Sequence, residues 1–181
     1  VQAQHDKKLL ERLDSMTRFT ERSDFESILN LTYPKVFSIA PREQLLEAME
    51  EAMENEEFSS SIDSLVILTI EPPIVTNNAQ YVLISHSMLM YMKFREVPDS
   101  NDKEGITLLT NLMEDEFGKG NVRYNQHTGT MRIYMLATLL AIRDEHSPEW
   151  SFLNLDEDSM DIADLLLPED VLGKIKTALT R

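Results

Sequence analysis

Cysteine is absent from the 181 residues of this chain. The protein therefore forms no disulfide, uses no thiol as a nucleophile and offers no thiolate ligand to a metal. Glycine is scarce as well, with five residues, none of them grouped as a phosphate-binding loop requires. Nucleotide binding through such a loop is therefore not expected.

Basic residues are few compared with acidic ones. Lysine and arginine together number 17 against 32 aspartates and glutamates, which gives a formal net charge of -15. A surface of this sign repels the phosphate backbone of nucleic acids and also anionic lipids, so we expect no nucleic-acid partner. The simplest role of such acidity is to keep the protein in solution.

Long hydrophobic runs are also missing. The longest run that is mostly apolar covers residues 133–142, about half the length that a membrane-spanning helix needs, so no membrane span is predicted. With 42% hydrophobic residues, the chain can nevertheless bury a core of its own. We predict a single domain over residues 5–181, with a core over 5–155 and a C-terminal extension over 156–181.

The first residues resemble the end of a signal peptide. Val1 and Ala3 are small residues that match the minus-three and minus-one positions of a signal-peptidase site. This pattern predicts an exported protein, either periplasmic or secreted. The alternative is an arbitrary start of the chain, in which case we expect a cytoplasmic protein.

Hydrophobic periodicity predicts three helices in the first part of the chain. Residues 5–22 place apolar side chains on one stripe of an amphipathic helix. Ser23 and Glu26 fit a capping box that starts a second, short helix. Pro41 suits the first turn of a third helix, which we expect to run to about residue 57.

Strand-like alternation follows these helices. It predicts long strands over residues 62–71, 81–94 and 130–142, and a short aromatic strand that contains Trp150 and Phe152. Both faces of the strand at 81–94 are fairly apolar, so this strand should be covered at least in part on both sides. Helices followed by mostly antiparallel strands predict an α+β fold, with the helices gathered on one face of a sheet.

One helix is predicted between the strands and one at the C-terminal end. The first covers residues 102–117 and should turn five apolar side chains inward: Leu108, Leu109, Leu112, Met113 and Phe117. The second opens at Pro168, after an acidic loop that is predicted over residues 156–164.

Four segments carry a family resemblance. They are the opening helix with residues 23–29 (SDFESIL), residues 32–37 (TYPKVF), the strand at 136–144 (LATLLAIRD) and the aromatic strand at 149–153 (EWSFL). Together, over about residues 5–155, they resemble the nuclear transport factor 2-like superfamily, whose fold is also called cystatin-like, and in particular its exported bacterial members. In that superfamily the last hairpin often consists of a strand, an acidic turn and an aromatic strand.

The resemblance implies a strongly curved antiparallel sheet that wraps around the N-terminal helices as a cone, with room for a pocket at the wide end. Relatives include ketosteroid isomerases, dehydratases, polyketide cyclases, transport factors and exported proteins without an assigned activity. The fold alone therefore does not decide the function. The helix at 102–117 and the tail after residue 155 depart from the compact pattern, and either could cover the pocket mouth.

His86 is the strongest candidate for chemistry. It is predicted to lie among methionines on the concave face, where a desolvated imidazole could act as base or acid near neutral pH. The alternative is a structural histidine bonded to the backbone or to a tyrosine. Isomerase chemistry also needs a carboxylate base, and the apolar faces of the strands at 81–94 and 130–142 contain none. A pocket for an apolar ligand would be lined by His86, Met88, Met90, Met135 and Tyr134.

We expect neither a metal nor a cofactor. The helix at 41–57 carries a row of carboxylates, namely Glu47, Glu50, Glu51 and Glu54. No histidine lies at helical spacing with them, so a solvated helix face is the simpler interpretation.

Three functions remain open from the sequence. The first is a non-catalytic binding module that holds a small apolar ligand in the cone, or a protein partner on an exposed sheet face. The second is a small-pocket enzyme of the isomerase or dehydratase type that uses His86. The third is a structural domain that forms a homodimer.

Overall fold

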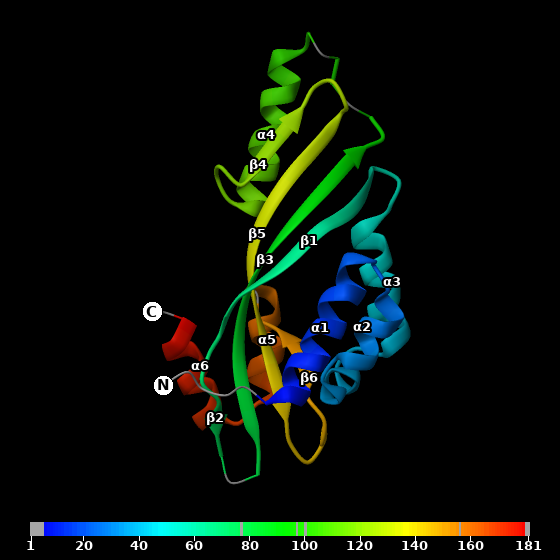
Figure 1. Ribbon diagram of the computed structural model, residues 1–181. Coiled ribbons are helices and arrows are strands. Elements are labelled where there is room, and N and C mark those ends of the chain that lie inside the picture. The colour runs from blue at the N-terminus through cyan, green and yellow to red at the C-terminus, as the bar shows by residue number, and fades with distance from the viewer. Residues whose placement is uncertain (1–5, 77, 97, 100, 156, 180–181) are drawn as a thin grey trace.

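The computed structural model describes residues 6–76, 78–96, 98–99, 101–155 and 157–179. Helices come first and strands follow, with one helix between the strands and two at the C-terminal end (Figure 1). The predicted α+β fold class is therefore confirmed. The elements are α1 (Lys7–Glu21), α2 (Phe25–Leu31), the 3-10 helix η1 (Pro34–Ser38), α3 (Arg42–Met53), β1 (Phe58–Ile70), β2 (Ile74–Val75), β3 (Gln80–Phe94), α4 (Lys103–Phe117), β4 (Val122–Asn125), β5 (Thr130–Arg143), β6 (Ser151–Asn154), α5 (Glu157–Leu166) and α6 (Glu169–Leu179). The prediction that the helices gather on one face of the sheet is wrong, because α1 and α6 pack on opposite faces of β3.

The strands form one antiparallel sheet in the order β1-β3-β5-β4. In addition, β2 pairs with the start of β3 and β6 pairs with the last part of β5. β3 and β5 pair without a break from Gln80 opposite Arg143 to Lys93 opposite Thr130. These two strands run through the whole sheet, which is long and strongly twisted (Figure 1). We call residues 80–86 and 137–143 the proximal half of the sheet, and residues 87–94 and 130–136 the distal half.

One face of the sheet, here the first face, carries helices in both halves. In the proximal half, Val82 and Ile84 pack with Leu9 and Leu13 of α1. Trp150 and Phe152 of the predicted aromatic strand belong to the same cluster. This cluster fixes α1 against the first face of the sheet, at the end where β6 pairs with β5.

In the distal half, α4 covers the first face. Met90, Met131 and Ile133 of the sheet form a buried cluster against which Leu109 and Met113 of α4 pack. The two-residue alternation shows that this is the face that carries α1, because β3 and β5 keep one register from end to end.

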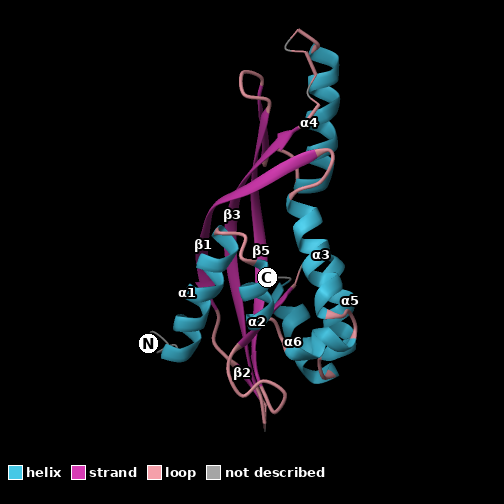
Figure 2. Ribbon diagram, turned by 90° about the vertical axis from the view of Figure 1, so that its right-hand side faces the viewer, coloured by secondary structure: helices cyan, strands magenta, loops and turns pink. Residues whose placement is uncertain are grey.

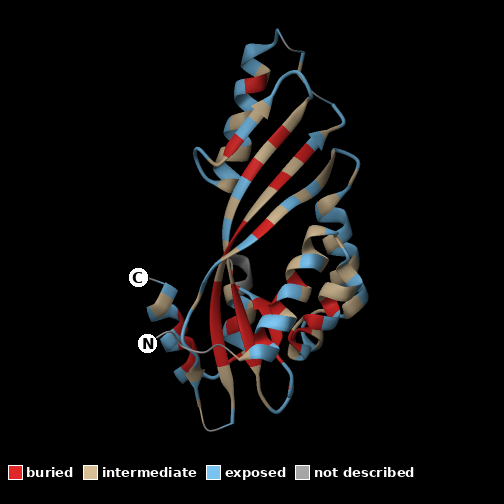
Figure 3. Ribbon diagram, viewed as in Figure 1, coloured by how far each residue is buried: buried red, intermediate tan, exposed pale blue. Residues whose placement is uncertain are grey.

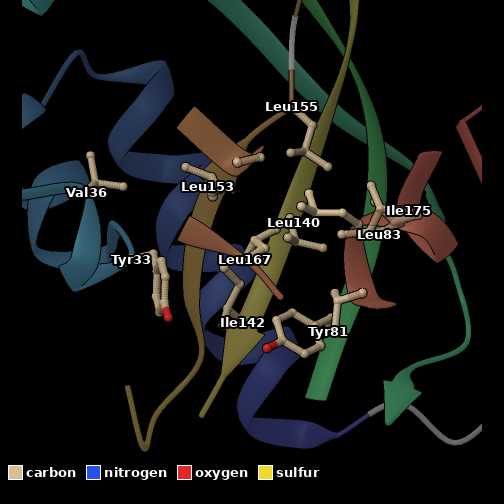
Figure 4. Close-up of a cluster of buried hydrophobic side chains, with 13 residues drawn as sticks. Tyr33, Val36, Tyr81, Leu83, Leu140, Ile142, Leu153, Leu155, Leu167 and Ile175 are labelled. Atoms are coloured by element: carbon tan, nitrogen blue, oxygen red, sulfur yellow. The ribbon is translucent and has the colours of Figure 1, made fainter. Parts of the chain in front are cut away.

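The second face is covered in the proximal half alone. Tyr81 and Leu83 of β3 and Leu140 of β5 pack with Val171 and Ile175 of α6 (Figure 4). Figure 2 shows α1 and α5 on opposite sides of the strands. The prediction that β3 is covered on both sides in part is therefore confirmed, and its fully covered part is the proximal half (Figure 3).

The acidic loop predicted over residues 156–164 is wrong from residue 157 onward, where α5 begins. Ala163 and Leu167 are buried in the proximal core, and Met160 packs against it. Their spacing of three and four residues is that of a helix stripe, whereas the acidic residues between them face outward. The high acidic content concealed this stripe.

The inward face predicted for α4 is also wrong at two positions. Leu108 is 63% exposed and Leu112 is 55% exposed, whereas Leu109, Met113 and Phe117 do pack on the sheet. The six large apolar residues of this helix occupy more of its surface than the narrow distal sheet can bury.

Three helix and strand boundaries differ from the prediction. The N-cap of α2 is Asp24 rather than Ser23, since the Asp24 side chain accepts a hydrogen bond from the Ser27 amide. α3 ends at Met53 rather than near residue 57, and β1 already begins at Phe58. Phe58 starts the strand because its ring packs edge-on against Phe94, with 6.4 Å between the ring centroids.

Candidate functional site

The second face of the sheet is open in its distal half. Leu136 is 67% exposed, Val66 is 51% exposed and Tyr134 is 37% exposed, so within the described chain no helix covers them. The open face consists of Ser61, Ser64 and Val66 of β1, Ser87, Leu89, Tyr91 and Lys93 of β3, Arg123 of β4, and Thr130, Arg132, Tyr134 and Leu136 of β5.

The end of the open face nearest the proximal half is apolar. Val66 and Leu136 flank Ser87 on its two sides, and Leu89 lies directly opposite Tyr134 in the next row. Side chains that are directly opposite on antiparallel strands lie about 5 Å apart, so these apolar groups form one continuous surface. Exposed apolar groups that are clustered in this way mark interaction sites more often than scattered ones do.

The far end of the open face is basic and aromatic. Tyr91 lies opposite Arg132, and Arg132 lies opposite Arg123. Lys93 follows in the next row, opposite Thr130. None of these three cations takes part in an ion pair within the described residues, although two arginines lie directly opposite each other.

An open hollow of about 470 Å³ lies at this basic end. Its lining residues are Tyr91, Arg123, Tyr124, Asn125, Thr128, Thr130 and Arg132. Guanidinium groups bind carboxylates or phosphates through two parallel hydrogen bonds, and a tyrosine hydroxyl can add a third. The hollow can therefore receive an anionic group.

The long edge of the sheet, β1, is protected against pairing with another strand. Its register with β3 shifts between Ile62 and Ser64 and again between Ile67 and Thr69, which marks two irregularities of the β-bulge type. The Glu21 carboxylate at the end of α1 accepts a hydrogen bond from the Leu65 amide at 3.1 Å. The two irregularities and this hydrogen bond hinder the addition of a further strand, so a partner has better access to the open face than to this edge.

His86 lies in the middle of β3 and is 5% exposed. It belongs to the first face, between the proximal and distal clusters, with Ile67 and Ala137 on the neighbouring strands. Its Nδ1 atom has no hydrogen-bond partner among the described residues. Burial lowers the pKa of this imidazole below its usual value, so the folded protein holds it in the neutral form.

The register brings together four of the five residues predicted to line a ligand pocket. His86, Met88 and Met90 alternate on the first face of β3, and Met135 lies directly opposite Met88. Tyr134 lies on the other face, where it belongs to the open face. His86 lines neither the hollow at the basic end nor a second one, of about 440 Å³, at the tip of the proximal half.

That second hollow is bordered by a group that is already paired. Arg143 binds Asp6 at 2.8 Å and Gln80 at 2.7 Å, and its guanidinium stacks 4.9 Å from the centre of the Trp150 ring. Trp150 also donates a hydrogen bond to Asp6, which lowers the pKa of that carboxyl. The charge of Arg143 is therefore compensated, and its role is to fix the start of α1 to the sheet.

The sequence interpretation included a partner on an exposed sheet face, but it did not locate that face. Arg132 was the available signal, because it interrupts the apolar alternation of β5 on the same side as Tyr134 and Leu136. The uncovered half could not be located from alternation alone, since it depends on where α5 and α6 end on the sheet.

The described residues contain neither a metal site nor a membrane-spanning helix. Among the described residues, no group of histidine and carboxylate side chains has an arrangement that could hold a metal ion, and no helix combines the length and hydrophobicity needed to cross a membrane. Residues 1–5, on which the export prediction rests, lie outside the described residues. The chain matches no protein-family model, no curated protein and no solved structure, so the resemblance to the nuclear transport factor 2-like superfamily stays a prediction.

Proposed function

We propose that the protein is a non-catalytic interaction module that docks a protein partner on the open face. The observation that carries this proposal is the exposure of Leu136, Val66 and Tyr134 on one face of the sheet, in the half that no helix covers within the described chain. Burial of such groups by a partner is favourable at roughly 25 cal/mol for each Å² removed from water.

The location of the apolar groups favours a macromolecular partner over a small ligand. They lie on a broad sheet surface, whereas small-molecule sites are usually concave and enclose most of the ligand. The hollow at the basic end is open to solvent and lies beside this apolar surface.

The enzyme alternative has less support. A general base must reach the proton that it removes, but His86 is 5% exposed and lines neither hollow. The described chain also places no carboxylate beside it on the first face. Its neutral imidazole fits a structural role between two hydrophobic clusters.

Photo-cross-linking tests the proposal. A benzoylphenylalanine introduced in place of Leu136 should yield a discrete cross-linked product with another protein in the native cells. The same group in place of Leu165, which is 74% exposed on α5, is the matched control and should not yield that product. The substitution Val66→Asp should abolish the product formed from position 136, because it places a charge in the buried part of the contact.

Two results would count against this function. One is a cross-linking pattern that is the same from positions 136 and 165, which would indicate random collisions. The other is a product from position 136 that persists with Val66→Asp, since the two side chains flank the same residue of β3.

A further inference from the structure

We infer that the partner element is an amphipathic α-helix whose apolar stripe lies on Leu136 and Tyr134 and whose carboxylates bind Arg132 and Arg123. This inference rests on the proposed function and specifies the chemistry of the partner. It is carried by the juxtaposition of an exposed apolar surface and unpaired cations on one sheet face.

The arginines of the open face differ from most other arginines of the chain in that they form no ion pair with the described residues. The structure describes eight arginines, and five of them form ion pairs: Arg12, Arg18, Arg42, Arg95 and Arg143. Of the three that do not, two are Arg123 and Arg132, which lie directly opposite each other. In a protein with a net charge of -15, two like charges held together without a counterion on a potential docking surface indicate complementarity to an external anion.

The geometry of the sheet favours a helical partner. In the distal half β3 pairs on both sides, and β5 pairs with β4 from Thr130 to Ile133, so most of the backbone groups of these two strands are already used. A segment that lies across their side chains must satisfy its own backbone hydrogen bonds, as a helix does. The covered parts of this sheet are packed by helices of the chain itself, among them α1, α4, α5 and α6.

The spacing of the open face sets the pattern of that helix. Leu136 and Arg132 are four residues apart on β5, which corresponds to about 13 Å along a strand. A helix rises 1.5 Å per residue, so about eight or nine of its residues cover this distance. Apolar residues at i and i+4 would therefore contact Leu136 and Tyr134, and carboxylates near i+8 would reach Arg132.

A protein segment fits better than a nucleic acid. Single-stranded nucleic acids also bind arginine and tyrosine on open sheets, but they need a basic path along their backbone. Here the cations occupy one end and an aliphatic surface the other, and the net charge of the protein repels a polyanion. A few carboxylates beside an apolar stripe experience less of this repulsion.

Selection from a displayed library tests the inference directly. The probe is a library of helix-forming peptides with one randomised face, selected on the full chain and counter-selected on its Leu136→Asp variant. We expect the selected peptides to combine apolar residues at i and i+4 with Asp or Glu about two turns further along. Their affinity should fall at least about tenfold with Arg132→Glu, and a peptide Glu→Lys change should restore binding to that variant.

Matched controls separate this charge effect from a general one. Lys174→Glu changes the charge equally, but it lies exposed on α6, and it should leave the affinity unchanged. Circular dichroism of each variant verifies that the chain is folded. A single-stranded oligothymidylate at about 150 mM salt should not bind.

The other possible outcomes contradict either the inferred helix, the proposed function or both. Peptides that depend on Leu136 but tolerate Arg132→Glu would overturn the helix-with-carboxylates inference and leave the proposed function intact. An absence of any peptide that depends on Leu136 would overturn both. Oligothymidylate binding that Arg132→Glu removes, or self-association that Leu136→Asp removes, would assign the face to a nucleic acid or to a second copy and would overturn the inference.

Discussion

At the scale of single residues, the imidazole of His86 is held away from water. It is 5% exposed, its Nδ1 has no hydrogen-bond partner among the described residues, and aliphatic side chains flank it on both neighbouring strands. Protonation would place an uncompensated charge in this surrounding, which is why burial lowers its pKa. The fold therefore keeps His86 neutral under conditions in which an unfolded histidine begins to titrate.

This difference predicts how stability depends on pH. The unfolded chain takes up a proton on His86 near pH 6.5, whereas the folded chain resists it, so the free energy of unfolding should decrease as the pH falls below about 6.5. The slope from one proton is at most about 1.4 kcal/mol per pH unit, and His86 contributes none above that range. Urea unfolding at several pH values below about 6.5 should show that the free energy of unfolding falls with pH, and His86→Leu should make this dependence weaker.

The exposed His127 provides the control for this measurement. It lies in the turn between β4 and β5, and His127→Gln should leave the slope of the unmodified protein in place. An identical pH dependence in His86→Leu and in the unmodified protein would show that His86 is not the titrating group.

At the scale of elements, α4 has one buried and one exposed apolar side. Ile106 is 9% exposed, whereas Leu108, two residues later, is 63% exposed. Ile106→Ala should lower the free energy of unfolding by about 2–4 kcal/mol through lost burial and a cavity. Leu108→Gln should change it by no more than about 0.5 kcal/mol, because that side chain already contacts water. Chemical denaturation of both variants compares the two faces, and equal losses would contradict the orientation of this helix.

Elements were predictable wherever local pattern decides the structure. The period-two alternation located β3 and β5 to within one residue, because both strands are long and well packed. α5 was missed because its acidic composition outweighed the spacing of Met160, Ala163 and Leu167. The error at Leu108 has another origin: helical periodicity does not say how wide a surface the sheet offers.

The candidate site was less predictable than the fold. His86, Met88 and Met135 could be placed on one face, since this follows from alternation and antiparallel pairing. The open face could not be recognised in the same way, because the sequences of covered and uncovered strand faces both contain leucine and tyrosine. Which of them meets solvent depends on the positions of α5 and α6, and these are set by tertiary packing.

At the scale of the whole molecule, the two halves of the sheet differ in how much they bury. The proximal half lies between helices on both faces, whereas the distal half is covered on the first face alone (Figure 3). Local opening costs less where fewer apolar groups are buried. Amide hydrogens of β3 and β5 should therefore exchange faster at 87–94 and 130–136 than at 80–86 and 137–143.

Hydrogen–deuterium exchange with mass spectrometry measures this contrast on the intact chain. A selected peptide bound to the open face should slow exchange in the distal half and leave the proximal half nearly unchanged. Uniform protection along both strands would mean that the sheet opens as one unit, and it would contradict a less stable distal half.

The unbroken register of β3 and β5 also restricts how this protein can change during evolution. Suppose that a single residue is inserted near Ala137 and the proximal half keeps its pairing. The side chains of residues 130–136 in β5 would then exchange faces. Arg132 and Tyr134 would then be forced into the core beneath α4, while Met131 and Ile133 would turn to solvent. Viable length changes in these strands must therefore come in pairs of residues or fall in the turns, so the docking surface and the hydrophobic core are inherited together.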